Sequence, residues 1–155
     1  MQKTTSNAGA LVLLSGGQDS TTCLHWAVDT FGKGTRAIGF NYGQRHAIEL
    51  TFAEQNATSL GVPLVVKDVR GLLTPSSLTD GQGDHNASSQ INPDLPASFT
   101  AGRNLLFLTI AASYAAEHGI KDIVTGVCQT DFSGYPDCRR TTMDAIQLAL
   151  SLGLG

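Results

Sequence analysis

Apolar and polar positions along this chain fall into blocks that predict strands followed by helices. Four consecutive apolar residues, 11–14, predict a short buried strand. Residues 21–31 then repeat apolar positions at helical spacing, with Leu24, Ala27 and Val28 on one face. The chain is therefore expected to begin its fold with a strand, a polar turn and a helix.

The same order of elements continues along the rest of the chain. Further strands are predicted over 35–43, 62–70 and 121–128, and further helices over 45–61, 101–119 and 141–153. The predicted inward positions of the second and last helices are Ile48, Phe52, Ala53, Ala57 and Leu60, then Met143, Ile146 and Leu150. Strands that alternate with helices favour an α/β fold, in which helices cover both faces of a parallel sheet.

The segment 71–101 departs from this pattern. It is rich in Ser, Asp, Asn, Gly and Pro and has no apolar period, so we expect a long mobile loop or lid, with a disordered insertion as the alternative. No strand pattern follows the last helix. We therefore expect residues 1–155 to form a single nucleotide-binding domain that is truncated at its C-terminal side.

Composition narrows the classes of function. A net charge of −3, with only 10 Lys and Arg, argues against direct nucleic-acid binding. No apolar run approaches the roughly 20 residues of a membrane span, and no export signal is visible, so we expect a cytoplasmic protein without a membrane partner. The three cysteines, Cys23, Cys128 and Cys138, do not form a zinc-binding pattern.

The turn after the first strand reads "SGGQDS". A glycine-rich turn between a strand and a helix directs unpaired backbone N–H groups at one small volume, which suits a phosphate. Asp19 would repel a bare phosphate, so its presence favours a bridging Mg²⁺. The alternative is a tight turn in which Asp19 only caps the helix. The predicted nucleotide-binding residues are Ser15, Gly16, Gly17, Gln18, Asp19 and Ser20.

Two further polar clusters follow predicted strand ends or begin a helix. In "FNYGQRH", Arg45 suits a phosphate or a carboxylate, and His46 either orients a leaving oxygen or caps the next helix. In "AGRN", we expect Arg103 to direct its charge at a nucleotide or substrate. The alternative is that Arg103 is simply exposed and that Asn104 is the N-cap of the helix.

The segment "QTDFSGYPDCRR" is the most unusual. A carboxylate accepts hydrogen bonds from the N–H groups of a guanine-like ring, and a tyrosine stacks on such a ring. The alternative is a surface turn with ordinary ion pairs. The residues that fit a purine-like substrate here are Asp131, Tyr135, Asp137 and Arg139.

Ser-Gly-Gly-x-Asp-Ser resembles the signature loop of the PP-loop (N-type) ATP pyrophosphatases, whose fold is Rossmann-like and related to the adenine nucleotide alpha-hydrolases. Together, "SGGQDS", "FNYGQRH", "GRN" followed by "FL", and "DFSGYPDCR" resemble the QueC (ExsB) family of 7-cyano-7-deazaguanine synthases. The last motif is the diagnostic one. The resemblance extends over residues 11–153.

The resemblance implies a ligase of queuosine biosynthesis that uses ATP and Mg²⁺. In that family ATP adenylates a carboxy-deazaguanine, ammonia displaces AMP to give the amide, and a second ATP activates the amide, which loses AMP to form the nitrile. Carried onto this chain, the catalytic residues are Asp19, Arg45, Arg103 and Asp137. The substrate residues are Tyr42, Gln44, Asp131, Tyr135, Asp137 and Arg139.

Two departures from the family pattern stand out. Ala101 replaces the usual proline of "PGRN", and the four-cysteine zinc site and further elements of the family's C-terminal part are absent from this sequence. The family also implies a homodimer. Two alternatives stay open: another PP-loop ATP pyrophosphatase, and a truncated, non-catalytic nucleotide-binding module.

Overall fold

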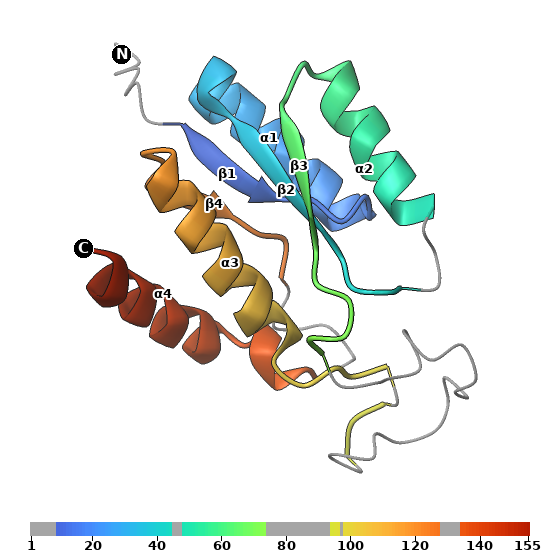
Figure 1. Cartoon of the computed structure of the whole chain (residues 1–155), viewed down its shortest axis with the longest axis vertical. Helices are drawn as coiled ribbons and strands as arrows, with labels where there is room; N and C mark the ends of the chain where they lie inside the picture. The colour runs from blue at the N-terminus through green and yellow to red at the C-terminus, as the bar shows by residue number, and fades with distance from the viewer. Residues whose placement is uncertain (1–8, 45–47, 74–93, 97, 128–133) are drawn as a thin grey trace. The chain divides into compact units, whose positions relative to one another are not determined.

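The computed structural model of the chain describes residues 9–44, 48–73, 94–96, 98–127 and 134–155 (Figure 1). Strands and α-helices alternate through these ranges, as the sequence predicts. The elements are β1 (Ala10–Leu13), α1 (Gln18–Phe31), η1 (Gly32–Gly34), β2 (Arg36–Asn41), α2 (Ile48–Ser59), β3 (Leu64–Asp68), α3 (Arg103–Glu117), β4 (Asp122–Val124), η2 (Pro136–Cys138) and α4 (Arg140–Leu154). No helix within the described ranges is both long enough and apolar enough to cross a membrane.

The four strands form one sheet in the order β3-β2-β1-β4. β1 is parallel to both of its neighbours, and Leu11 is paired with Arg36 of β2 and with Ile123 of β4. Such parallel neighbours need crossover connections, which the helices supply. The predicted α/β fold is confirmed.

The predicted strand over 121–128 is longer than the strand observed. β4 ends at Val124, and the chain then turns toward the first turn of α1. A Cβ on Gly126 would lie 3.1 Å from the backbone carbon of Asp19 and 3.2 Å from its Cβ. The absence of a side chain at residue 126 therefore permits this close approach.

The described chain divides into two compact units. The first contains Met1–Phe40, Ala47–Lys67 and Ile110–Gly126, and the second contains Asn41–His46, Asp68–Thr109 and Val127–Gly155. The sheet, α1, α2 and the second half of α3 belong to the first unit. The first half of α3, η2 and α4 belong to the second. Each unit is described by itself below.

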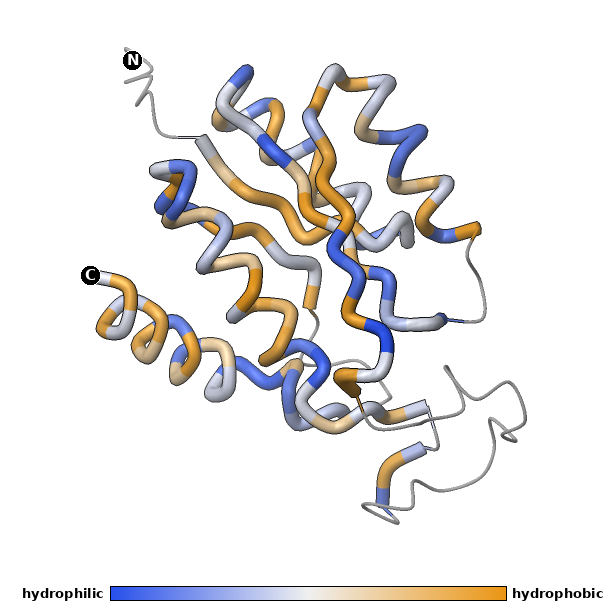
Figure 2. Tube along the Cα trace, in the orientation of Figure 1, coloured by the Kyte–Doolittle hydropathy of each residue, from blue (hydrophilic) through white to orange (hydrophobic). Residues whose placement is uncertain are grey.

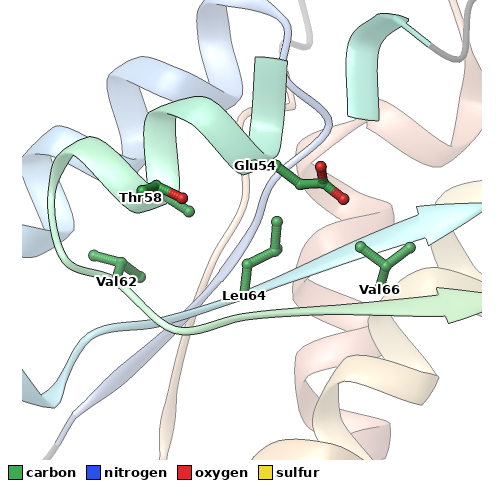
Figure 3. A pocket seen from close by; sticks show the side chains of 6 residues that line it. Glu54, Thr58, Val62, Leu64 and Val66 are labelled. Atoms are coloured by element: carbon green, nitrogen blue, oxygen red, sulfur yellow. The ribbon is translucent and has the colours of Figure 1, made fainter. Parts of the chain in front are cut away.

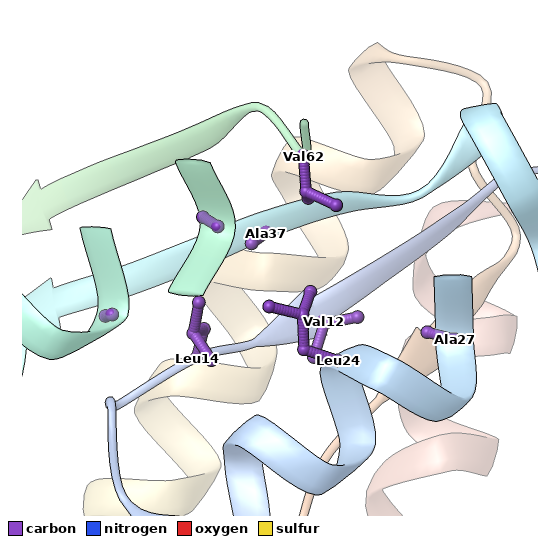
Figure 4. Close-up of a cluster of buried hydrophobic side chains, with 8 residues drawn as sticks. Val12, Leu14, Leu24, Ala27, Ala37 and Val62 are labelled. Atoms are coloured by element: carbon purple, nitrogen blue, oxygen red, sulfur yellow. The ribbon is translucent and has the colours of Figure 1, made fainter. Parts of the chain in front are cut away.

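The core of the first unit lies between the sheet and the helices α1 and α2 (Figure 4). Val12 of β1 and Leu14, just after the end of that strand, meet Leu24 of α1, and all three side chains are at most 1% exposed. Because successive strand residues point to opposite faces, Leu11 and Ile38 are buried on the other side of the sheet. The second half of α3, which belongs to this unit, lies along that face (Figure 1).

Helix α2 differs from its predicted packing. Ala53 and Ala57 are buried as expected, whereas Ile48 and Phe52 are 58% and 46% exposed. Each residue of a helix turns the side chain by about 100°, so Phe52 points well away from Ala53. The buried stripe of α2 is narrow because small alanines let its backbone approach the sheet closely.

The second unit contains α4, which follows η2 directly. Met143, Ile146 and Leu150 are half-buried, so the predicted inward face is the more covered one but is not a closed core. Leu148 and Leu152 are 61% and 77% exposed. Figure 2 shows apolar residues along much of this helix.

Candidate functional site

The "SGGQDS" turn connects β1 to α1, as the sequence predicts. Its two serines shape the loop. The backbone N–H of Ser15 donates to the hydroxyl of Ser20 at 3.2 Å, and that hydroxyl donates to the carbonyl of Gly17 at 3.0 Å. Ser20 is only 8% exposed, so its hydroxyl holds the turn together. The prediction that Ser20 binds the nucleotide is not tested by this arrangement.

The first turn of α1 is open to a ligand. Gly17 occupies the N-cap position, and no side chain caps the helix. The first N–H groups of a helix have no partner within it, so this end of α1 presents hydrogen-bond donors and the positive end of the helix dipole. Gly17, Gln18 and Asp19 are exposed. These features suit an anion such as a phosphate.

Gly16 fixes the path of the loop against α2. Its φ of +92° lies in the region that L side chains rarely adopt, and a Cβ here would lie 2.0 Å from the carbonyl oxygen of Glu49. Only glycine fits both conditions. The backbone of the loop therefore rests directly on the first turns of α2.

Asp19 lies inside the first turn of α1 and does not cap it, which removes the alternative reading of this residue. The negative charge of Asp19 affects the thiol of Cys23. Burial raises the pKa of this thiol, and the charge of Asp19 raises it further. In the described part of the chain, no group of three or more His, Cys, Asp or Glu residues is placed to hold a metal ion. The role of Asp19 in binding Mg²⁺ stays a prediction.

A second group of predicted site residues gathers at the first turn of α3, in the second unit. The backbone N–H of Asn104 donates to Oδ2 of Asp137 at 3.0 Å, and the side-chain amide of Asn104 donates to Sγ of Cys138 at 3.2 Å. The side chain of Asp137 thus accepts a hydrogen bond from the first turn of α3. From the sequence alone, Asn104 is a candidate for the N-cap of this helix. The predicted motifs "GRN" and "YPDC" are in direct contact.

Asp137 is buried, with 5% of its surface exposed. Its Oδ1 is buried and has no hydrogen-bond partner among the residues that the structure describes. Leaving a buried acceptor unpaired costs about 1–3 kcal/mol, and native proteins rarely do so. A donor supplied by a ligand would remove this cost.

Tyr42 lies against the same turn of α3. Its ring centroid is 5.5 Å from that of Phe107, and the guanidinium carbon of Arg103 lies 5.8 Å from the Tyr42 centroid. Arg103 and Phe107 are one helical turn apart, so both contact one ring. Gln44, predicted to bind substrate, accepts a hydrogen bond from the backbone N–H of Tyr42 through its Oε1 at 3.0 Å.

Tyr135 is held by residues from the segment 71–101. Its hydroxyl lies 2.6 Å from Oγ of Ser98, and its ring lies 5.5 Å from the ring of Phe99. Arg139, also predicted to bind substrate, is exposed at the N-cap position of α4. Ser98, Phe99 and Phe107 were not predicted as site residues.

Several predictions fall outside the described residues. These are Arg45, His46 and Asp131, together with 74–93 and residue 97 of the predicted lid. The remaining predicted residues form two groups, one at the start of α1 and one at the start of α3, each within its own compact unit. The first suits a phosphate, and the second combines an arginine, aromatic rings and a buried carboxylate.

One surface groove contains no predicted site residue. It lies between α2 and the edge strand β3, and Figure 3 shows Glu54 and Thr58 of the helix facing the apolar side chains Leu64 and Val66. It offers one acidic group and no cation. The groove therefore does not resemble a site for nucleotide phosphates.

Comparison with known proteins identifies the family. Residues 9–155 match the family model described as "Queuosine biosynthesis protein QueC". The chain belongs to the QueC family. A 7-cyano-7-deazaguanine synthase of Laribacter hongkongensis is 49% identical over 147 residues, and one of Chromobacterium violaceum is 47% identical over 152. These alignments cover 94% and 96% of this chain but 64% and 65% of the relatives, so the chain spans somewhat less than two thirds of their length.

A solved structure supports the fold. The chain is similar to a predicted subunit of a tRNA methyltransferase from Methanocaldococcus jannaschii, with a TM-score of 0.53 over 93% of this chain and 64% of that one. The sequence identity is 19%, so this likeness concerns the fold alone.

Proposed function

We propose that this QueC-family chain acts in the synthesis of 7-cyano-7-deazaguanine, converting 7-carboxy-7-deazaguanine and ammonia to the nitrile at the expense of ATP. One observation carries the proposal. The chain is 45–49% identical to relatives named 7-cyano-7-deazaguanine synthase. Two groups of its residues suit such a reaction. Those groups are the open start of α1 and the cluster at the start of α3.

The reaction begins with a poor electrophile. An oxygen of the substrate carboxylate attacks the α-phosphorus of ATP, and the bond to the bridging oxygen breaks so that pyrophosphate leaves. Ammonia then attacks the carbonyl carbon of the acyl adenylate, and AMP leaves with the electron pair of the C–O bond. The product of this half is the amide.

The second half repeats the activation. The amide oxygen attacks the α-phosphorus of a second ATP, and pyrophosphate leaves again. The nitrogen then loses both of its protons while the C–O bond breaks, and AMP departs as the nitrile forms. Both halves need groups that donate hydrogen bonds to the phosphate oxygens, and a cation near the charge that develops in the transition state.

The start of α1 suits the nucleotide in this scheme. The uncapped N–H groups of its first turn would donate to phosphate oxygens, and Gly16 and Gly17 let the backbone approach them. Asp19, exposed beside them, is a suitable oxygen ligand for Mg²⁺, whose remaining ligands would be phosphate oxygens and water. Bound Mg²⁺ would neutralise charge on the phosphates.

The cluster at the start of α3 suits the deazapurine. The unpaired Oδ1 of Asp137 would accept from an N–H of the guanine-like ring, and Tyr135 offers an aromatic face near it in sequence. Arg45 and Asp131 stay proposed catalytic and substrate residues. Cytoplasmic location, a homodimer and ammonia as the nitrogen donor also remain proposals.

A second candidate is nucleotide binding without turnover. The observation in its favour is the uncapped start of α1, which suits a nucleotide phosphate whether or not a reaction follows. The absence of zinc ligands from this chain stays a prediction.

The test is a reaction of the purified 155-residue chain with Mg·ATP, ammonium and 7-carboxy-7-deazaguanine, followed by pyrophosphate assay and product mass. The Laribacter hongkongensis synthase serves as the positive control. Substrate-dependent pyrophosphate and a nitrile product are expected. Nucleotide binding without product, under conditions in which the control reacts, would favour the second candidate.

A further inference from the structure

The guanidinium of Arg103 lies in a half-buried position at the start of α3. The guanidinium group carries a positive charge. Within the described residues Arg103 has no carboxylate partner, in contrast to Arg70 and Arg140, which pair with Asp68 and Asp144. A half-buried cation without an anion is poised to receive one.

Tyr42 holds this cation from one side. The guanidinium carbon lies 5.8 Å from the ring centroid, within the range of a cation–π contact. The ring is itself backed by Phe107, at 5.5 Å between centroids, and its loop is tied by the Gln44 hydrogen bond to the Tyr42 backbone. A ring fixed in this way limits where the arginine side chain can point.

The surroundings favour a planar, singly charged anion over a phosphate. The backbone N–H of Asn104 is already donated to Asp137, so the start of α3 offers fewer donors to a phosphate. The carboxylate of Asp137, held by the residue next to Arg103, would also repel a doubly charged group more strongly than a singly charged one. A carboxylate matches the two parallel N–H bonds of the guanidinium fork.

We infer that Arg103 binds the carboxylate of the deazaguanine substrate and that Tyr42 is a positioning residue for Arg103 and does not stack on the substrate ring. This inference rests on the proposed function. It assigns Arg103 to recognition of the carboxylic acid before adenylation. The deazapurine ring of the substrate is then bound by other residues. The neutral amide formed half-way through the reaction lacks the charge that Arg103 recognises.

Calorimetric titration of the 155-residue chain with two ligands tests this. The ligands are 7-carboxy-7-deazaguanine and its neutral 7-carboxamide. Arg103→Gln is expected to weaken binding of the acid by about 10- to 100-fold, the effect of losing a charge-assisted pair, and binding of the amide by less than about 3-fold. A merely structural role for Arg103 would weaken both ligands alike.

Two variants of Tyr42 distinguish the contribution of its aromatic ring to binding from that of its hydroxyl. Tyr42→Leu is expected to weaken binding of the acid by about 3- to 10-fold, with little effect on the amide, because the cation–π contact is lost. Tyr42→Phe keeps the ring and is expected to retain the preference for the acid. Tyr114→Leu is the matched control, since Lys67 lies 5.5 Å over that ring and outside this cluster.

The outcomes separate the inference from the proposed function. Wild-type chain that binds neither ligand would contradict the proposed function. Binding of both ligands with equal losses in Arg103→Gln would overturn the inference and leave the function standing. A loss of Mg·ATP affinity in Arg103→Gln, with the acid unaffected, would also overturn it by assigning the arginine to phosphate.

Discussion

The backbone N–H of Asn104 donates to Oδ2 of Asp137 at 3.0 Å, which joins the first turn of α3 to the η2 turn 33 residues later in the sequence. The same carboxylate keeps its other oxygen buried and unpaired among the described residues. One oxygen therefore has a structural role, and the second is left for a donor that the described residues do not supply.

This division of roles predicts different effects for two variants of Asp137. Asp137→Ala removes the acceptor for the start of α3 and should lower the free energy of unfolding by about 1 kcal/mol, as loss of a helix cap does. Asp137→Asn keeps an acceptor for the backbone N–H of Asn104, so it should lower the free energy of unfolding by less than Asp137→Ala does.

Asp137→Asn should nevertheless weaken binding of 7-carboxy-7-deazaguanine by about tenfold or more, because an amide donor replaces the charged acceptor. Denaturant melts and calorimetric titration measure the two effects. Asp144→Asn, in the exposed pair with Arg140, is the control. Undiminished substrate binding by Asp137→Asn would show that Asp137 acts only as a cap.

The loop between β1 and α1 depends on Gly16. Gly16→Ala combines a strained φ with a Cβ placed 2.0 Å from the Glu49 carbonyl oxygen. We expect a loss of about 2 kcal/mol or more in the free energy of unfolding and a large loss of Mg·ATP affinity. Gly153→Ala, in α4 with nothing near its Cβ, should be neutral or stabilising by up to about 1 kcal/mol. Similar stability for the two variants would contradict the close packing of the loop.

The charge of Asp19 should be measurable at Cys23. Burial and the Asp19 carboxylate raise the pKa of this thiol above its ordinary value of 9.0. In a background with Cys128→Ser and Cys138→Ser, Asp19→Asn should shift the pH midpoint of iodoacetamide alkylation downward, because a negative charge that opposes the thiolate is removed. The midpoint should stay above 9.0, since burial persists.

Asp29→Asn, an exposed acid further along α1, is the control for this shift. An unchanged midpoint in Asp19→Asn would mean that the carboxylate does not face Cys23. The raised pKa also fixes the sign of the effect on stability. The unfolded chain forms the thiolate more readily, so the contribution of Cys23 to stability falls as the pH rises through about 9.

The sequence predicts the order and type of every described strand and α-helix, because hydrophobic periodicity is set locally. It does not predict how wide the buried stripe of a helix is. Phe52 is apolar and correctly spaced but exposed, since the depth of α2 against the sheet is set by Ala53, Ala57 and the Gly16 loop, which are tertiary contacts. The early end of β4 has a similar origin, in the approach of Gly126 to Asp19.

The candidate site shows the same limit. The motifs predict Arg103, Tyr42 and Asp137 as polar or aromatic residues of a site, but their contacts connect positions far apart in sequence. Phe107 had a local signal, because it is one turn from Arg103 on the same helix. Ser98 and Phe99 had none, since they lie within the segment 71–101, which has no apolar period.

The central claim is that this QueC-family chain activates a carboxylate, and then an amide, by attack of their oxygen on the α-phosphorus of ATP. The most direct measurement uses 7-carboxy-7-deazaguanine with ¹⁸O in both carboxylate positions, unlabelled ATP, Mg²⁺ and ammonium. The AMP, pyrophosphate and deazapurine products are then weighed by mass spectrometry. The Laribacter hongkongensis synthase is run beside the chain as the positive control.

The account predicts that each AMP carries one ¹⁸O atom, that pyrophosphate carries none, and that the deazapurine product is an unlabelled nitrile. Labelled inorganic phosphate formed with unlabelled ADP would indicate attack at the γ-phosphorus, and labelled pyrophosphate would indicate attack at the β-phosphorus; either result would contradict attack at the α-phosphorus. AMP without label, or no turnover by this chain while the control reacts, would contradict the claim for this protein.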